Sequence, residues 1–272
     1  TGAAEITALE TRAVGIPWNF NPVLGLARQP MWPRVFETYG EDAHVASVMG
    51  AAYIRAQQGD GLSRSDKVAT CMKHYLGYSV PRSGRDRTPA YIPERQLRQR
   101  FLKPFAAAVR AGTVTCMVNS SEINGVPVHS STFYLKDLLR DELGFKGFVV
   151  SDWADIENLY TREKVAKDRR EAVKMAVLAG IDMSMVPYDY SFYDTLIELV
   201  HDDEVPMSRI DEAVADILRV KFKLGLFERP YPNPSLLDNV GLEESRLVNL
   251  QAAWEAITPV SYTHLRAHET VL

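Results

Sequence analysis

A carboxylate and an indole, Asp152 and Trp153, close a short apolar run at Phe148–Val150. A sugar ring has apolar C–H faces and a rim of hydroxyl groups, so an aromatic wall beside an ionised carboxylate suits it. Such a carboxylate can attack an anomeric carbon and form a covalent intermediate. Asp152 can equally be a helix N-cap, because helical sequence follows it. The residues alone favour neither alternative.

Lys73, His74 and Arg34 carry hydrogen-bond donors that suit the same kind of ligand. Lys73 and His74 end a second apolar run. Adjacent strand residues point to opposite faces, so both reach one pocket only if the strand end is distorted. Otherwise the lysine points inward to a carboxylate and the histidine packs elsewhere. Arg34 follows Trp32-Pro33 in a loop, where a surface position is the default interpretation.

Further charged residues lie close to these positions. Asp155, three residues after Asp152, could pair with it as acid and base. The first turn of a helix favours an acidic residue, however, and we interpret Asp155 as structural. Arg85, Asp86 and Arg87 lie in a long polar loop. They form either a solvated charge run with weak ion pairs or part of a substrate entrance.

Short apolar runs alternate with long amphipathic segments along the chain. This alternation predicts strands and helices in turn. Strands are predicted over 18–26, 68–78, 114–119, 148–151 and 182–186. Helices are predicted over 42–58, 93–111, 169–179, 191–201, 206–226 and 243–258, with one more between a cap at Ser130 or Ser131 and Gly144.

The alternation indicates a parallel sheet with right-handed crossovers. The predicted strands are apolar on both faces, as buried parallel strands are. Neither GxGxxG nor GxxxxGK occurs, so dinucleotide-binding and P-loop folds lose support. An α/β fold of the TIM-type (β/α) barrel kind, incomplete because its first strands are missing, fits better. That fold makes polar residues at C-terminal strand ends functional, and they are Lys73-His74, Asn119–Ser121, Ser151-Asp152 and Ser184.

The bulk composition excludes some classes of function. The chain has 272 residues with 46% hydrophobic and 24% charged residues, which is ordinary globular usage. A net charge of -4 without a basic stripe argues against a nucleic-acid partner. No apolar run is long enough to predict a membrane span. Cys71 and Cys116 lack metal-ligand spacing and lie in apolar runs, so we expect buried structural thiols.

The two ends of the chain differ from the rest. Residues 1–17 resemble the middle of an amphipathic helix that runs into a Gly-Ile-Pro turn, and we expect the native protein to continue upstream. Residues 259–272 resemble a translated adapter sequence, and we interpret them as a non-native tail, with a natural polar tail as the alternative. His264 and His268 imitate a metal pair at i, i+4 spacing, but we predict no metal site there.

Several stretches together resemble glycoside hydrolase family 3. They occur in the family's order and cover nearly everything from residue 10 to residue 258. One of them alone would be a weak match, whereas the ordered set is specific. The stretches are WNFNPVLGLARQPMWPRVFETYGED, VATCMKHYLGYS, GRDRTPAYIPERQLRQRFLKPF, CMVNSSEINGVPVHSS, GFKGFVVSDWADI, AGIDM and IDEAVADILRVKFKLGLFE.

The resemblance implies a partial catalytic barrel over residues 1–228 and a linker over 229–258. The linker would lead to an α/β sandwich domain that the chain lacks. The implied activity is retaining hydrolysis that releases terminal β-D-glucose from oligo- or polysaccharides, without a metal or organic cofactor. A periplasmic or secreted location is plausible by the same resemblance.

The resemblance also implies roles for individual residues. Asp152 corresponds to the family's nucleophile, and Trp153 lines the glucose-binding subsite. Lys73, His74 and Arg34 correspond to residues that bind sugar hydroxyl groups. The implied acid/base Glu belongs to the second domain, downstream of this chain, and an Asp that grips the sugar lies upstream. The alternative is therefore a sugar-binding barrel fragment without useful catalysis.

The chain departs from the family pattern at several positions. Pro33 replaces the usual Gly before Arg34, which stiffens the loop. Ser120 stands where many members carry a Tyr, which puts sugar contacts there in doubt. The segment KHYLGYS continues without the loop His of the family's N-acetylglucosaminidases. That absence weighs against the N-acetylglucosaminidase branch.

Overall fold

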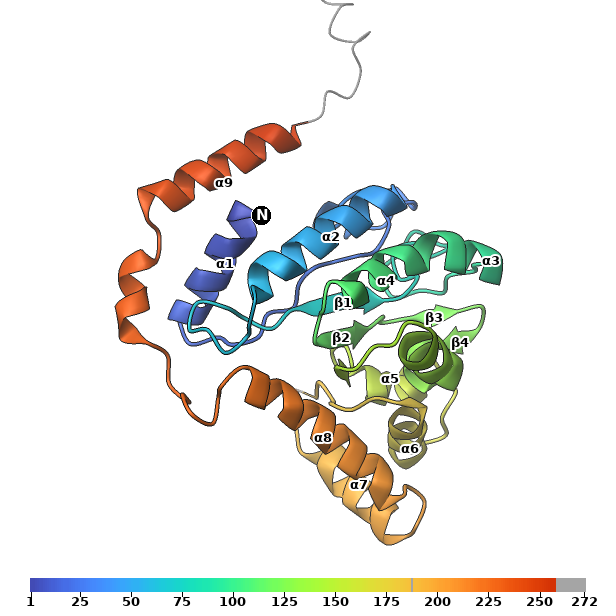
Figure 1. The fold of residues 1–272 in the computed structure, drawn as a ribbon. Coiled ribbons are helices and arrows are strands. Elements are labelled where there is room, and N and C mark those ends of the chain that lie inside the picture. The colour runs from blue at the N-terminus through green and yellow to red at the C-terminus, as the bar shows by residue number, and fades with distance from the viewer. Residues whose placement is uncertain (187, 258–272) are drawn as a thin grey trace, which may run out of the picture.

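The computed structural model describes residues 1–186 and 188–257 (Figure 1). The helices are α1 (Gly2–Ala13), η1 (Val35–Glu37), α2 (Ala43–Gln58), α3 (Glu94–Gln96), η2 (Leu97–Phe101), α4 (Leu102–Arg110), η3 (Val128–Ser130), η4 (Phe133–Glu142), α5 (Asp155–Thr161), α6 (Arg169–Ala179), α7 (Ser191–His201), α8 (Met207–Lys223), η5 (Pro234–Asn239) and α9 (Glu243–Ala256). The strands are β1 (Cys71–Tyr75), β2 (Thr115–Val118), β3 (Glu122–Ile123), β4 (Val126–Pro127) and β5 (Phe148–Val150).

Three parallel strands, in the order β1-β2-β5, form the centre of the fold. Isolated parallel bridges extend this sheet at both edges. The bridges pair Trp18 with Ala69, Val23 with Lys73 and Val150 with Met183. Five parallel segments therefore follow one another in space in the same order as in the chain. This is the winding of a TIM-type barrel, of which the described residues form an incomplete arc.

Two predicted strands are formed only in part. The segment 18–26 joins the sheet through bridges at Trp18 and Val23. Between them Pro22 has no N–H, so it accepts a bond from the Lys73 amide without donating one. The segment 182–186 pairs only at Met183, where the arc ends and no strand covers its other side among the described residues.

The helices agree more closely with the sequence pattern. Helices α6 and α7 have the predicted bounds. The predicted helix 93–111 consists of α3, η2 and α4 in direct succession and ends at Gly112, whose φ of +88° suits a glycine. Asp42 caps α2 by accepting the amides of His44 and Val45, each at 2.8 Å. Ser131 accepts the amide of Tyr134 at 3.3 Å and so caps η4.

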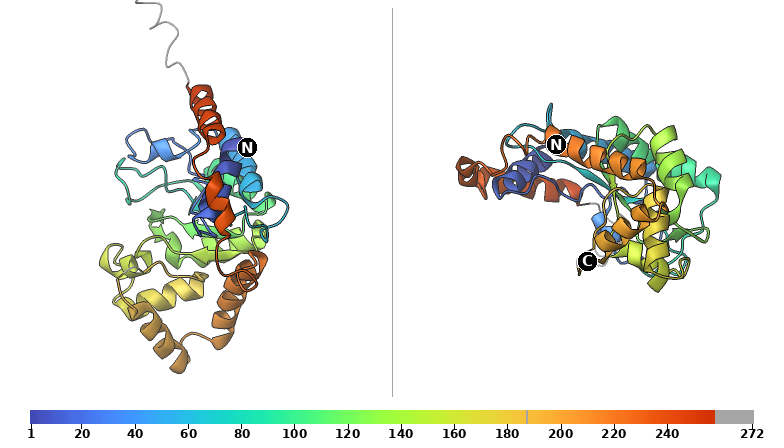
Figure 2. Two further views of the ribbon diagram at one scale, coloured as in Figure 1. Left: turned by 90° about the vertical axis from the view of Figure 1, so that its left-hand side faces the viewer. Right: turned by 90° about the horizontal axis from the view of Figure 1, so that it is seen from below.

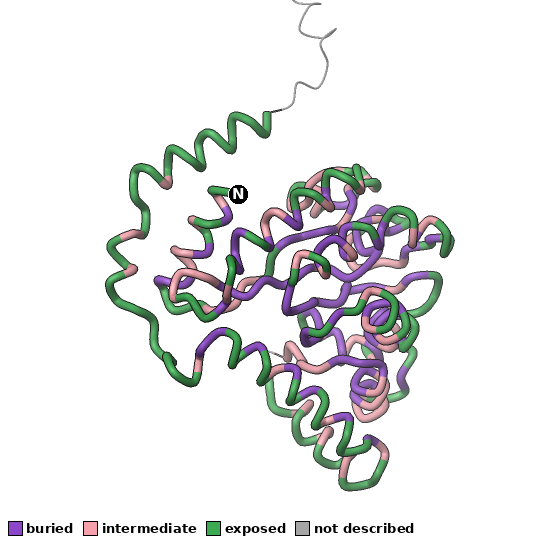
Figure 3. Tube along the Cα trace, viewed as in Figure 1, coloured by how far each residue is buried: buried purple, intermediate pink, exposed green. Residues whose placement is uncertain are grey.

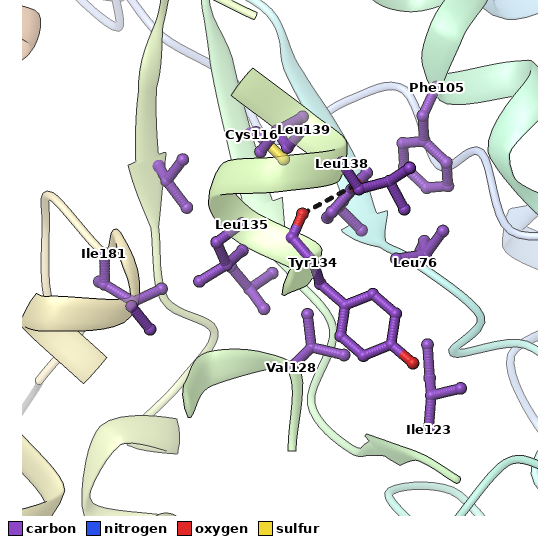
Figure 4. Packing of buried hydrophobic residues seen from close by; sticks show 14 of the residues in the cluster. Leu76, Phe105, Cys116, Ile123, Val128, Tyr134, Leu135, Leu138, Leu139 and Ile181 are labelled. Atoms are coloured by element: carbon purple, nitrogen blue, oxygen red, sulfur yellow. Dashed lines mark hydrogen bonds between the residues drawn. The ribbon is translucent and has the colours of Figure 1, made fainter. Parts of the chain in front are cut away.

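The core has two parts because the strands are buried on both faces (Figure 3). The larger part lies between the sheet and the helices; Figure 4 shows Tyr134 there, beside Val128 and Ile123. The smaller part lies on the other face of the sheet and includes the ends of α8. Cys71 and Cys116 are buried free thiols, one in each part, as the sequence predicted.

A short hairpin, β3–β4, follows β2 and was not expected. Its turn is Asn124-Gly125, where both residues have positive φ, 54° and 84°. This dipeptide is a strong signal for a two-residue hairpin turn. Each strand has only two residues, which is too short for an alternating pattern to appear in the sequence.

Beyond α8 the chain leaves the sheet. Helices η5 and α9 lie along α1, as Figures 1 and 2 show, and α9 has no buried residue. The role of residues 229–258 as an interdomain linker stays a prediction. The proposed tail 259–272, with His264 and His268, lies outside the described residues. No described helix has the length and apolar character that a membrane crossing requires.

A buried carboxylate joins the last helices to the sheet. The side chain of Asp182 is fully buried. One oxygen accepts the amide of Val149 and Nη2 of Arg140, both at 2.7 Å. The other accepts Nη2 of Arg209 on α8 at 2.6 Å. Arg209 is itself buried and also donates to the carbonyl of Ile181. Helices η4 and α8 are thereby fastened to β5 through one side chain.

Asp182→Asn is expected to lower the free energy of unfolding by about 3 kcal/mol, because it removes the buried counter-charge of the Arg209 guanidinium and leaves only an exposed one. Urea denaturation of this chain measures the change. Glu212→Gln is the matched control: Glu212 pairs with the same arginine at 3.4 Å but is exposed, so its loss should cost less than about 1 kcal/mol. Equal effects of the two substitutions would contradict the assignment of Asp182 as the anchor.

Candidate active site

Parallel strands bring their carboxyl ends to one edge of the sheet. His74 near the end of β1 and Asp152 just after β5 meet there: Nε2 of His74 lies 3.7 Å from Oδ2 of Asp152. Arg34, from the loop before η1, reaches the same place and lies 3.3 Å from Nε2 of His74. Three of the residues predicted from separate segments of the sequence are therefore neighbours.

The two oxygens of Asp152 have different surroundings. Oδ1 accepts the amide of Trp153 at 2.6 Å. Oδ2 is buried and has no hydrogen-bond partner among the described residues. The residue as a whole is 7% exposed. Burial, and then the neighbouring charge of Asp155, raises the pKa of Asp152. The carboxylate is thus held by one oxygen and unpaired at the other.

Asp152 is not the cap of the helix that follows it. Helix α5 begins at Asp155, and its N-cap is Ala154 in a left-handed conformation, with φ of 55°. Oδ1 of Asp152 bonds the amide next to it and none of the amides of α5. The N-cap alternative considered from the sequence is therefore not what the structure contains.

The contact with Arg34 determines which ring nitrogen of His74 carries no proton. A guanidinium can only donate hydrogen bonds, so Nε2 of His74 accepts from Arg34 and carries no proton. Burial, and then the charge of Arg34, holds the pKa of His74 well below its usual value. Neutral His74 presents a lone pair to Oδ2 of Asp152, which explains why no hydrogen bond joins them. Glu37 holds Arg34 in turn: Nε and Nη2 of Arg34 donate to the two carboxylate oxygens of Glu37 at 2.7 and 2.9 Å.

Lys73 lies next to His74, where the strand is irregular. The pairing of β1 with β2 shifts register between Met72 and Tyr75. This is the distorted strand end that a shared pocket for both side chains requires. The Lys73 amine has no hydrogen bond or ion pair to any described residue. Burial lowers its pKa, and the charges of Arg34 and Asp152 act on it.

Trp153 supplies an aromatic surface beside the carboxylate. Its side chain is 48% exposed, and its Nε1 donates to the hydroxyl of Tyr188 at 3.0 Å. The two rings meet edge to face with centroids 6.0 Å apart. Tyr188 had no signal in the sequence, because it lies outside any regular element.

The sequence also gave no indication of His129. This buried residue of η3 accepts the amide of Asp152 at Nε2, at 3.2 Å. Burial lowers its pKa, which keeps the ring neutral and able to accept. A lone histidine after an apolar dipeptide carries no periodic signal, and only the fold brings it to Asp152. It fixes the backbone from which the carboxylate projects.

Asp155 is structural in the sense expected, but its partners come from far away in the sequence. Its side chain is almost fully buried, and Oδ1 pairs with Arg87 at 3.5 Å and Arg162 at 3.2 Å. Arg87 and its neighbour Asp86 are therefore more than part of a solvated run. Asp86 also accepts Nε1 of the buried Trp32 at 2.8 Å.

The residues 1–186 and 188–257 contain no group of three or more His, Cys, Asp or Glu side chains placed to hold a metal ion.

Asn119, after β2, and Ser151, after β5, form hydrogen bonds with backbone amides. Oδ1 of Asn119 accepts the amide of Ser121, and Ser151 accepts the amide of Met185 at 2.8 Å. Of the strand-end residues singled out in the sequence, these hold the loops in place.

A model of the glycosyl hydrolase family 3 N-terminal domain matches residues 1–220. The chain belongs to glycoside hydrolase family 3. It is 50% identical over 266 residues to a lysosomal β-glucosidase of Dictyostelium discoideum, covering 95% of this chain and 32% of that protein. It is 38% identical to a β-xylosidase of Formosa agariphila, covering 93% of this chain and 36% of that protein.

Solved structures of family members have the same fold. The β-glucosidase of Listeria innocua superposes with a TM-score of 0.86 at 31% identity, over 89% of this chain and 34% of that chain. The family 3 chain thus spans about a third of the length of the relatives it matches. The fold class expected from the sequence, a TIM-type barrel in incomplete form, is confirmed.

Asp152→Asn is expected to stabilise this chain at neutral pH. A raised pKa means that the folded state binds the proton more tightly than the unfolded chain does, so stability is lost as the pH rises through the folded-state pKa. The amide cannot ionise and avoids that loss. Its advantage in melting temperature should shrink as the pH falls below that pKa, whereas exposed Asp60→Asn should show no such trend. A variant less stable than wild type at neutral pH would contradict the prediction.

Proposed function

We propose that the full-length protein hydrolyses terminal β-D-glucosidic bonds of oligo- or polysaccharides with retention of configuration, and that Asp152 is the nucleophile. The observation that carries this proposal is the unpaired, buried Oδ2 of Asp152. A carboxylate held through one oxygen keeps the other free to approach a carbon atom. The class of substrate is supported by membership of the family and by the β-glucosidases among its relatives.

In the first step Oδ2 of Asp152 bonds to C1 of the sugar while the bond from C1 to the leaving oxygen breaks. The leaving oxygen takes a proton from a carboxylic acid. In the second step water attacks C1, the acid's conjugate base takes a proton from that water, and the Asp152 carboxylate is released. The two carboxyl groups of retaining enzymes stand about 5–5.5 Å apart.

The acid/base group is expected from outside this chain. Nε and Nη2 of Arg34 donate to the two carboxylate oxygens of Glu37, and this contact lowers the pKa of Glu37. A carboxyl group with a lowered pKa is poorly suited to deliver a proton. Oδ1 of Asp155 is occupied by Arg87 and Arg162. The relatives are about three times as long as this chain, so their remaining length provides room for such a group.

The remaining site residues bind the sugar in this proposal. The amine of Lys73 has no partner among the described residues and can donate to hydroxyl groups. His74 and Arg34 lie beside Asp152 and orient the ring, with Nδ1–H of His74 and Nη1 of Arg34, which also contacts the Tyr78 hydroxyl at 3.4 Å, as donors. Trp153 and Tyr188 offer an apolar surface to the C–H face of the ring.

The role of Asp152 can be tested in the full-length product of the gene. A 2-deoxy-2-fluoro-β-glucoside with a good leaving group should form a stable adduct, because fluorine slows the second step. Mass spectrometry of the digested protein should locate the adduct on Asp152. Asp152→Asn should abolish turnover of an aryl β-glucoside, with Asp60→Asn as the control. An adduct on another residue, or normal turnover by Asp152→Asn, would refute the assignment.

A second candidate concerns this chain by itself: it binds sugar without useful catalysis. Both carboxylates that interact with the site, Glu37 and Asp155, are committed to arginines, which supports this alternative. Calorimetry with glucose and an aryl β-glucoside assay on the same sample distinguish the two. We expect binding without measurable turnover. Turnover by the isolated chain would exclude the binding-only alternative.

A further inference from the structure

Arg87 reaches the site from a loop that the proposed reaction does not otherwise use. It lies between β1 and α3 and has a left-handed backbone conformation, with φ of 57°. The loop is closed around it: the amide of Arg82 donates to the carbonyl of Pro89 at 2.9 Å, and Ser83 bonds Thr88. The guanidinium then points away from the loop, and its Nη1 contacts Oγ of Ser120 at the end of β2.

A buried carboxylate holds this guanidinium. Oδ1 of Asp155 lies 3.5 Å from Nη1 of Arg87 and 3.2 Å from Nη2 of Arg162. Arg162 is fixed independently, because it also donates to the carbonyl of Ser120 at 2.9 Å and to Glu163 at 2.7 Å. Asp155 is therefore shared by two arginines, and Arg162 has two further contacts to the protein, through Nε to Glu163 and through Nη2 to the carbonyl of Ser120.

The protein does not engage every nitrogen of the Arg87 guanidinium. The described contacts engage Nη1 with Ser120 and Asp155, and Nε lies 3.9 Å from Asp86. Nη2 has no hydrogen bond to any described residue. The side chain is 34% exposed. A guanidinium carries five N–H donors in a fixed plane, so the anchored atoms leave the two N–H donors of Nη2, the free edge of Arg87, available to a ligand.

The guanidinium of Arg87 lies at the same end of the sheet as Asp152. Its two partners place it there: Asp155 is in the first turn of the helix that follows Asp152, and Ser120 follows β2, the strand between β1 and β5. The charge of Arg87 also acts on Asp152, His74 and His129, which agrees with this position.

We propose that Arg87 is a specificity-determining residue whose free guanidinium edge donates to hydroxyl groups of the sugar bound at Asp152. Asp155, Arg162 and Ser120 are positioning residues that hold it in place. The inference rests on the proposed glycosidase function and deepens it, by adding a contact that selects among sugars. Nη2 carries two N–H donors, which can bond two neighbouring hydroxyl groups of one sugar ring.

The test uses Arg87→Met and Arg87→Lys in the full-length protein, with aryl β-glucosides that lack one hydroxyl group each. Arg87→Met should lower kcat/KM for the parent glucoside by about 10- to 100-fold, the effect of losing hydrogen bonds to a charged donor. Arg87→Lys keeps the charge but not the fork and should also lose more than about fivefold. For the deoxy-glucosides that lack the contacted hydroxyls, wild type and both variants should be nearly equal.

Arg85→Met is the matched control, since it removes an arginine from the same loop, and it should resemble wild type. Melting temperatures exclude simple unfolding as the cause. If Arg87→Met lowers kcat/KM equally for every deoxy-glucoside, Arg87 acts only on the charge of Asp152 and the inference fails. Activity of Arg87→Met equal to wild type also refutes it. The proposed function itself is tested separately, because its failure would appear as a missing Asp152 adduct in wild type.

Discussion

The guanidinium of Arg34 lies 3.3 Å from Nε2 of His74, and the state of Asp152 depends on that contact. A histidine with a proton on Nε2 would donate to Oδ2 of Asp152 and occupy the atom proposed to react. Arg34 donates to that nitrogen, so His74 lies against the carboxylate without a hydrogen bond to it. Glu37 holds Arg34 in turn, so an ion pair in a loop helps to keep Oδ2 of Asp152 unpaired.

Buried polar atoms without hydrogen-bond partners lower the stability of the folded protein. Oδ2 of Asp152, Oδ2 of Asp155, Oγ of Ser79 and Oγ of Ser184 are all buried without a hydrogen-bond partner among the described residues. Oδ1 of Asn19, in the first parallel segment, is a fifth such atom. An unsatisfied buried polar atom costs about 1–3 kcal/mol. A hydroxyl group of a bound sugar could satisfy Oδ2 of Asp152, which lies at the carboxyl end of the sheet.

The sequence predicted what depends on local pattern and missed what depends on distant contacts. Helices α6 and α7 follow from periodicity and caps. Asp152 was found because a carboxylate at a strand end has meaning in a parallel barrel. His129 and the partners of Asp155 were not, because no local pattern relates residues 87, 129 and 162 to residue 152. The segment 18–26 is apolar like a strand, yet Pro22 limits its pairing.

The contacts that fix Asp152 all come from one stretch of the arc, between Arg34 and Trp153. Arg34 and His74 set the free oxygen, His129 holds the amide, and the Trp153 amide holds the other oxygen. These contacts need only the order β1-β2-β5 and the segment before β1. In the proposed reaction the proton donor faces the leaving oxygen, whereas Asp152 faces C1 of the sugar. The proposed nucleophile is thus positioned by contacts within this stretch, and its geometry does not depend on the part of the molecule that supplies the donor.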